Sequence, residues 1–222
     1  MQLKIWLVTG FTLVALTAQA EGLQCPDLAV TVTSGDPGLS ARVCEMVATS
    51  SAALAACNMP VPLPLSVTIK DRLAPACLGL YHCGEARIDL LKPAALPDAL
   101  AADSVFRNIA PSVLFSSIIM HELTHASYED AICPFPDCPT TAEYLAYAMQ
   151  IRSLPPSDRA TVLAMSESWG RISRDEINLV YMSLAPDRFA LKSYLHLSQR
   201  DDPCAYVGQI MRGDIVLDRE RP

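Results

Sequence analysis

Two histidines four residues apart follow a mostly apolar segment, and this combination limits the folds that the chain can adopt. The segment His121-Glu122-Leu123-Thr124-His125 has the pattern H-E-x-x-H. The residues before it are apolar nearly all round, which predicts a buried helix over residues 112–128. Residues four apart lie on one face of a helix, so both imidazoles can bind one metal ion while Glu122 takes a proton from a bound water. The alternative is that His121 and His125 are surface residues of an ordinary amphipathic helix.

Two histidines leave a zinc site incomplete, and Glu143 is the best candidate for a third ligand. A helix is predicted from Thr140 to about Ser153, after a proline-rich loop at residues 133–139. Glu143 lies in the first turn of this helix, with 17 residues between it and His125. The competing interpretation is a capping box, Thr140-Thr141-Ala142-Glu143, in which Glu143 reaches back to the backbone of Thr140 and binds no metal.

The order of these segments resembles the core of zincin-like metallopeptidases of the gluzincin type. The resemblance covers about 60 residues, from a strand predicted at Ala86–Leu91 through the H-E-x-x-H helix and the loop to the helix with Glu143. It implies one Zn²⁺ per chain, bound by His121, His125 and Glu143, and it implies that Glu122 is the general base. It also implies that Ala86–Leu91 is an edge strand that offers backbone hydrogen bonds to an extended peptide. The whole chain further resembles an uncharacterised bacterial secreted family with this core.

The chain departs from the zincin pattern at several positions. Tyr128 and Ala131 replace the Gly and the His or Asp of a metzincin-like continuation, which excludes that subclass. Many gluzincins have an acidic residue four positions after the glutamate, and here that residue is Tyr147, so support for a ligand histidine has to come from elsewhere. Tyr147 is the first candidate for stabilising the oxyanion. Tyr128, Tyr194 and His196 are further candidates, and for each of these residues the alternative is ordinary packing or a surface position.

The first twenty residues have the pattern of an export signal. Lys4 precedes an apolar run from Ile5 to about Ala18, and the run ends in Ala18-Gln19-Ala20, a small-x-small cleavage pattern. The run is short for a membrane anchor, although an uncleaved anchor is the alternative. We therefore expect a signal peptide at residues 1–20 and a mature chain that is periplasmic or secreted.

All eight cysteines follow the predicted signal, and an even number in an exported chain predicts up to four disulfides. The alternative, a thiolate zinc site, has no Cys-x-x-Cys pair to support it. Cys133 and Cys138 are close enough in sequence to close a small loop, and so are Cys77 and Cys83. Cys44 and Cys57 are predicted to lie on one helix, which begins at Asp36-Pro37. That spacing places them about 20 Å apart, so each has to pair elsewhere.

The charge of the chain excludes two classes of partner. There are 24 Asp and Glu against 17 Lys and Arg, a net charge of −7, and removal of Lys4 with the signal makes the charge −8. A chain this acidic lacks the basic surface that binds nucleic acid or an anionic membrane. We expect no nucleic-acid partner and no membrane association after signal cleavage, and the zincin resemblance implies a peptide or protein substrate.

Together these patterns predict an α+β fold that is mostly α, with disulfides and a small sheet containing strands at Leu65–Ile69 and Ala86–Leu91. Residues 21–222 are expected to form a single zincin-like domain, in which 155–222 could be a helical subdomain. Further helices are predicted to begin at the capping box Ser173–Glu176 and at Pro186. The leading functional hypothesis is an exported zinc-dependent hydrolase that acts as a peptidase. The rival hypothesis is a non-catalytic exported zincin-like binding or structural protein, with or without zinc.

Overall fold

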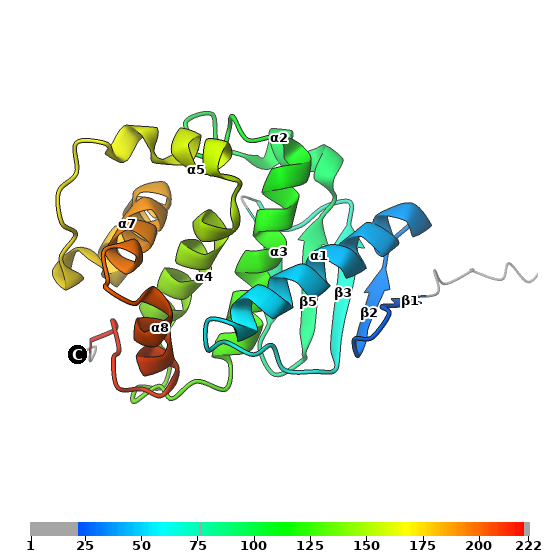
Figure 1. The fold of residues 1–222 in the computed structure, drawn as a ribbon. Helices are drawn as coiled ribbons and strands as arrows, with labels where there is room; N and C mark the ends of the chain where they lie inside the picture. The colour runs from blue at the N-terminus through cyan, green and yellow to red at the C-terminus, as the bar shows by residue number, and fades with distance from the viewer. Residues whose placement is uncertain (1–21, 76, 220–222) are drawn as a thin grey trace, which may run out of the picture.

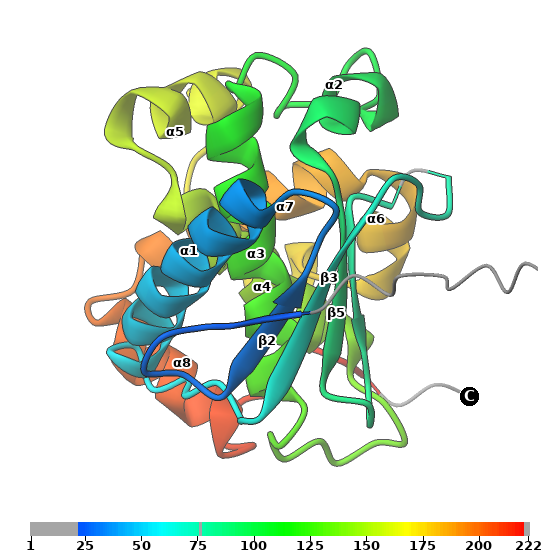
Figure 2. The ribbon, with the colours of Figure 1, turned by 90° about the vertical axis from the view of Figure 1, so that its right-hand side faces the viewer.

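Five short strands form one mixed sheet, and helices α1 and α3 pack on one of its faces (Figures 1 and 2). The computed structural model describes residues 22–75 and 77–219, so the predicted signal peptide lies outside the described residues. The strand order is β1-β2-β3-β5-β4. Strands β2, β3 and β5 are parallel, whereas β1 and β4 are antiparallel to their neighbours. The strands are β1 (Leu23–Gln24), β2 (Val30–Thr33), β3 (Leu65–Lys70), β4 (Gly79–His82) and β5 (Arg87–Leu91).

Both predicted strands are present, but the predicted edge strand is wrong. In β3, Leu65 and Val67 are buried, and Val67 lies opposite Ile88 of β5, as the alternation of apolar residues predicts. Strand β5 lies between β3 and β4, so its backbone groups are already paired on both sides. The edge strand next to it is β4, which the sequence analysis missed because a four-residue segment beginning with glycine carries almost no alternation signal.

The long helices form where they were predicted. Helix α1 (Pro37–Ala55) begins at Asp36, whose side chain accepts a hydrogen bond from the Gly38 N–H. Helices α3 (Pro111–Tyr128) and α4 (Pro139–Ser153) both have proline in the first turn. The remaining segments are η1 (Pro93–Ala95), α2 (Leu96–Ala99), α5 (Pro156–Leu163), η2 (Ala164–Ser166), η3 (Arg174–Glu176), α6 (Leu179–Leu184), α7 (Pro186–Ser198) and α8 (Pro203–Met211).

The Ser173–Glu176 capping box forms, but it does not open an α-helix. Both of its hydrogen bonds are present, yet the segment makes only the short 3₁₀ turn η3. Ile177 then leaves the helical conformation and is buried, and α6 begins after it with Asn178 as its cap. The capping box therefore provides hydrogen-bond partners for the N–H groups of one turn. The turn ends where Ile177 packs into the core.

Helix α3 is the centre of the molecule. The sheet lies on one side of it and α4 lies on the other, and α7 packs against the far side of α4 (Figure 1). Buried residues from the sheet, from α3 and from the C-terminal helices belong to one continuous hydrophobic core. Among the described residues, none of the helices has both the length and the apolar composition to cross a membrane.

Three disulfides join the elements: Cys25–Cys44, Cys57–Cys204 and Cys133–Cys138. Cys44 and Cys57 thus pair elsewhere, as expected, and the Cys133–Cys138 loop is closed. The possible pairing of Cys77 with Cys83 does not form, and both thiols are free. Strand β4 separates these two cysteines, and its four extended residues span about 10 Å from the first Cα to the last, whereas a disulfide requires Cα atoms within about 7 Å.

We expect a thiol assay on the denatured, unreduced protein to find two thiols per chain. In the folded protein the exposed Cys83 should react first, because Cys77 is partly buried and burial raises the pKa of its thiol. The Cys83→Ser variant is the control and should retain one slowly reacting thiol. A count of zero thiols in the unreduced protein would show that a fourth disulfide forms and that β4 is rearranged.

Candidate metal centre

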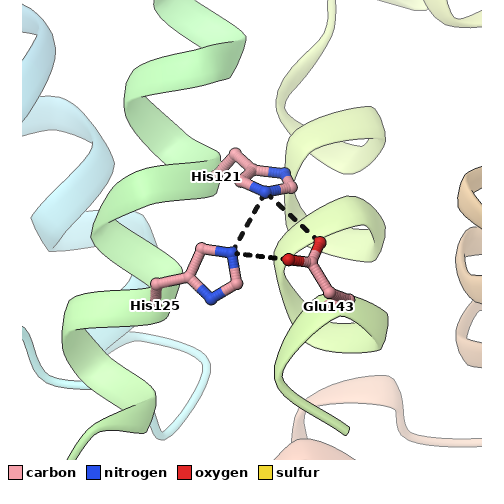
Figure 3. Close-up of side chains that lie close together, drawn as sticks. All are labelled: His121, His125 and Glu143. Carbon is pink, nitrogen blue, oxygen red and sulfur yellow. Dashed lines mark hydrogen bonds and ion pairs between the residues drawn. The ribbon is translucent and has the colours of Figure 1, made fainter. Parts of the chain in front are cut away.

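The three predicted ligands converge, and each is held by a helix (Figure 3). One turn of α3 separates His121 from His125, and their Nε2 atoms are 3.1 Å apart. Helix α4 brings Glu143 beside them, with Oε2 3.6 Å from Nε2 of His121 and Oε1 3.4 Å from Nε2 of His125. The two imidazoles are mostly buried, with side chains 13% and 18% exposed, so the alternative of two ordinary surface histidines is wrong.

The donor set fits a zinc ion. Nitrogen and oxygen ligands lie about 2.0–2.2 Å from zinc, so two ligands of a tetrahedral ion are about 3.3 Å from each other. The three separations above lie close to that value. Two imidazole nitrogens and one carboxylate oxygen are also the ligand types found in catalytic zinc sites, which keep the fourth position for water. His121, His125 and Glu143 are therefore the residues that could hold the ion.

The capping-box interpretation of Glu143 is wrong. The N–H groups of Thr140 and Thr141 donate instead to Oδ1 and Oδ2 of Asp218, each at 2.9 Å. The hydroxyl of Thr141 also donates to Oδ2 of Asp218, at 2.7 Å. A buried carboxylate from the C-terminal segment thus satisfies the amide groups at the start of α4, and the Glu143 side chain is free to point at the histidines.

A chain of hydrogen bonds fixes the tautomer of His121. A carbonyl only accepts, so the Ser117 hydroxyl donates to the Leu114 carbonyl, at 2.7 Å, and its oxygen can accept from Nε2 of Gln150, at 3.3 Å. The other end of this amide, Oε1, therefore faces Nδ1 of His121 at 3.0 Å and accepts a hydrogen bond from its N–H. With the proton on Nδ1, Nε2 of His121 directs its lone pair toward Glu143 and His125.

Gln150 thus supports the candidate ligand His121 in place of the acidic residue that is missing at position 147. This role of Gln150 was not predicted from the sequence. The signal was available: Gln150 lies seven residues after Glu143, on the same face of α4, and it is the buried polar residue of an otherwise apolar turn. Its partner Ser117 is on the preceding helix, and no sequence spacing indicates that pairing.

Substitution of Gln150 by Met is expected to weaken zinc binding about 10- to 100-fold, because the side chain keeps its length but loses the acceptor for Nδ1–H of His121. Titration with a competing chelator measures this loss. Gln150→Glu retains an oxygen acceptor and should bind zinc more tightly than Gln150→Met. Equal affinity in the wild type and Gln150→Met would show that the hydrogen bond does not support the ligand.

Glu122 lies beside the three donors and against the edge strand. It is buried, with 5% of its surface exposed, and burial raises the pKa of its carboxyl group to about 7. The backbone N–H of Tyr81 forms a hydrogen bond with it, which opposes this rise. Gly79 of β4 lies so close that a β-carbon there would be 2.5 Å from Oε1 of Glu122. The glycine thus leaves the space that the Glu122 carboxylate occupies.

Gly79→Ala is therefore expected to displace the Glu122 side chain and to lower activity at least about tenfold, while zinc content stays at the wild-type level. Gly170→Ala is the matched control, because a β-carbon at Gly170 meets no atom within 4 Å. Hydrolysis rate and metal content, measured on both variants, test this. Wild-type activity in Gly79→Ala would mean that the close approach of β4 to Glu122 has no part in the reaction.

The charge states of His121 and Glu143 favour metal binding at neutral pH, whereas the raised pKa of His125 means that this imidazole has to lose a proton when an ion binds. Burial and the nearby His125 lower the pKa of His121 to about 4. Burial opposes the charged forms of His125 and Glu143 as well, but their mutual hydrogen bond and charge outweigh it, raising the pKa of His125 and lowering that of Glu143. His121 is therefore neutral and Glu143 ionised, which are the forms that bind a metal ion.

The four residues considered for oxyanion stabilisation separate into two groups. Tyr147 and Tyr128 line the same cleft as the histidines, and the ring of Tyr147 lies edge-on to His121 with centroids 4.7 Å apart. Tyr194 lines a different pocket, with Arg152 and Arg159. His196 is buried and forms a 2.9 Å hydrogen bond with the Tyr144 hydroxyl, away from the candidate ligands.

The donors lie in a cleft of about 1000 Å³. Its walls come from β4, from the segment 99–106, from α3 and α4, and from the α6–α7 region. A cleft of this volume accommodates several residues of a peptide.

Comparison with known proteins gives one match. A model described as a family of unknown function, DUF6639, matches residues 30–220. No curated protein and no solved structure was found to match the chain.

Proposed function

The chain belongs to the DUF6639 family of unknown function, and from its site we propose that it is an exported zinc-dependent hydrolase that acts as a metallopeptidase. One observation carries the proposal: two imidazole nitrogens and a carboxylate oxygen converge, with a buried glutamate beside them, in an open cleft. The three disulfides are typical of the periplasm or the extracellular space, which is where we place the protein.

The residues of the site have distinct roles in this proposal. His121, His125 and Glu143 hold the ion, which when bound polarises the scissile carbonyl and lowers the pKa of water toward 7. The Glu122 carboxylate takes the proton from the attacking water and returns it to the leaving amine. Burial raises the pKa of the Tyr147 hydroxyl, so the group stays protonated at neutral pH and is able to donate a hydrogen bond to the developing oxyanion.

The free edge of β4 takes the role that the resemblance assigns to an edge strand. The Leu91 N–H donates to the Leu78 carbonyl, and in an antiparallel ladder bonded and non-bonded pairs alternate. Leu80 and His82 therefore bond to β5, whereas Gly79 and Tyr81 direct their N–H and C=O groups away from it. The Tyr81 N–H already bonds to Glu122, which leaves the N–H of Gly79 and the C=O groups of Gly79 and Tyr81 for a peptide. An extended peptide can add to this edge as a further strand.

A non-catalytic zincin-like protein is the second candidate, and the contact of Glu122 with β4 favours it. A glutamate that serves only to hold Gly79 and the Tyr81 N–H in place would be a structural residue. In that case the protein would bind a metal or a peptide without cleaving it.

The first experiment is elemental analysis of the wild-type protein, exported and purified without chelator, followed by hydrolysis assays on unstructured peptides. The proposal expects one zinc per chain and peptide cleavage that a chelator stops and added zinc restores. Folded protein that neither contains zinc nor takes it up would overturn the metallopeptidase. Zinc without cleavage of any peptide would favour the non-catalytic candidate.

A further inference from the structure

Large apolar side chains are exposed at the mouth of the cleft. Seven are exposed among residues 22–75 and 77–219, and three of these also line the cleft: Leu80 at 44%, Met165 at 53% and Leu184 at 81%. Leu80 is on the edge strand β4, Met165 is in η2 and Leu184 ends α6. Apolar groups from three separate elements thus gather around one opening.

The interior of the cleft is apolar as well. Beyond the candidate ligands its walls include Leu78, Leu100, Val105, Phe106 and Ile118. Two carboxylates in the wall are engaged within the protein: Asp187 accepts from the Val105 N–H at 3.0 Å, and Glu129 accepts from the Tyr81 hydroxyl and the Gly84 N–H. Asp103 and Arg188 also line the cleft, but most of the surface offered to a ligand is apolar, and exposed apolar surface of this kind marks a binding site.

The edge strand shows what kind of ligand fits. A lipid or a small apolar molecule would cover the apolar side chains but would give no partner to the outward N–H of Gly79 or to the outward C=O groups of Gly79 and Tyr81. An extended polypeptide satisfies those groups with its backbone and presents side chains to the apolar walls on alternate sides.

We infer that the substrate is an extended polypeptide segment with apolar side chains near the scissile bond, and that Met165 and Leu184 select it. The cleavage part of this inference rests on the proposed function, whereas the binding part does not. It also gives the C-terminal helical region a role, since Met165 and Leu184 both belong to it while the candidate ligands belong to α3 and α4.

The test compares two short fluorescent peptides of equal length and net charge, one with Leu, Val and Phe and the other with Thr and Gln at the same positions. Binding is measured by anisotropy on the zinc-loaded Glu122→Gln variant, and kcat/KM is measured on the wild type. We expect the apolar peptide to be favoured at least about tenfold in both measurements.

The variants Met165→Ser and Leu184→Ser should each reduce this ratio about threefold or more, and their exposure means that folding should be unaffected. Val180→Ser is the matched control, because Val180 is on the same helix α6 and 66% exposed but does not line the cleft. It should leave the ratio unchanged.

Equal treatment of the two peptides, or an equal effect of Val180→Ser and Leu184→Ser, would overturn the inference. Cleavage without an apolar preference would overturn it and leave the proposed function standing. If the protein binds the apolar peptide preferentially, in a way that depends on Leu184, but cleaves no peptide, the apolar binding cleft would be supported. The proposed peptidase activity would then be overturned.

Discussion

The Glu122→Gln variant should lose hydrolysis by at least about a hundredfold and keep one zinc per chain. The amide has nearly the size and shape of the carboxylate but cannot take a proton from water, and a positioned general base contributes about 10²- to 10⁴-fold to a reaction. Gln also retains an oxygen that accepts the hydrogen bond from the Tyr81 N–H, so β4 should stay in place. Peptide hydrolysis and elemental analysis on the same preparation measure both expectations.

A matched substitution separates the role of Glu122 from a general effect of losing a charge. Glu167 is exposed and lies outside the cleft, so Glu167→Gln should have wild-type activity. Loss of zinc or of folding in Glu122→Gln would contradict the assignment of Glu122 as general base and would make it a structural residue that holds the edge strand.

The second large effect is expected from His125→Ala, which removes one of three donors and should abolish stoichiometric zinc binding together with activity. A ligand that binds only the folded state at a thousand times its dissociation constant stabilises that state by about 4 kcal/mol. The wild type should therefore melt at a higher temperature with zinc than with a chelator, and His125→Ala should show no such difference. Differential scanning calorimetry with and without zinc measures this.

His82→Ala is the control for this experiment. His82 pairs with Asp89 on the sheet, with 3.2 Å between Nε2 and Oδ2, and it does not belong to the candidate ligand set. Its loss should leave the zinc-dependent shift in melting temperature intact. A shift that persists in His125→Ala, or disappears in His82→Ala, would place the metal elsewhere.

The features predicted correctly from the sequence are those that short, local residue patterns indicate. Helices α1 and α3 follow from proline or a capping residue at the start and an apolar run behind it. The approach of Glu143 to the two histidines, across the loop that Cys133 and Cys138 close, is what the resemblance to the gluzincin core implied.

The features that the sequence analysis missed depend on neighbours far away in the chain. Strand β4 is too short to show a period, and only its pairing with β5 reveals that it is the edge. The pairing of Gln150 with His121 joins two helices, and the choice between a capping box and a ligand role for Glu143 depends on Asp218, 78 residues after Thr140. The sequence favoured the ligand role of Glu143 without excluding the capping box, and the contact of Asp218 with the start of α4 excludes the box.

The contact of Asp218 with Thr140 and Thr141 has a consequence for the order in which the protein matures. A chain is synthesised from its N-terminus, so α3 and both its histidines leave the ribosome well before Asp218. Until Asp218 is synthesised, the first N–H groups of α4 lack this partner. The position of Glu143 beside the histidines then lacks the support of this contact. A shortened product that ends before residue 218 would carry both histidines but not this contact. The site therefore depends on a segment that is synthesised well after both histidines.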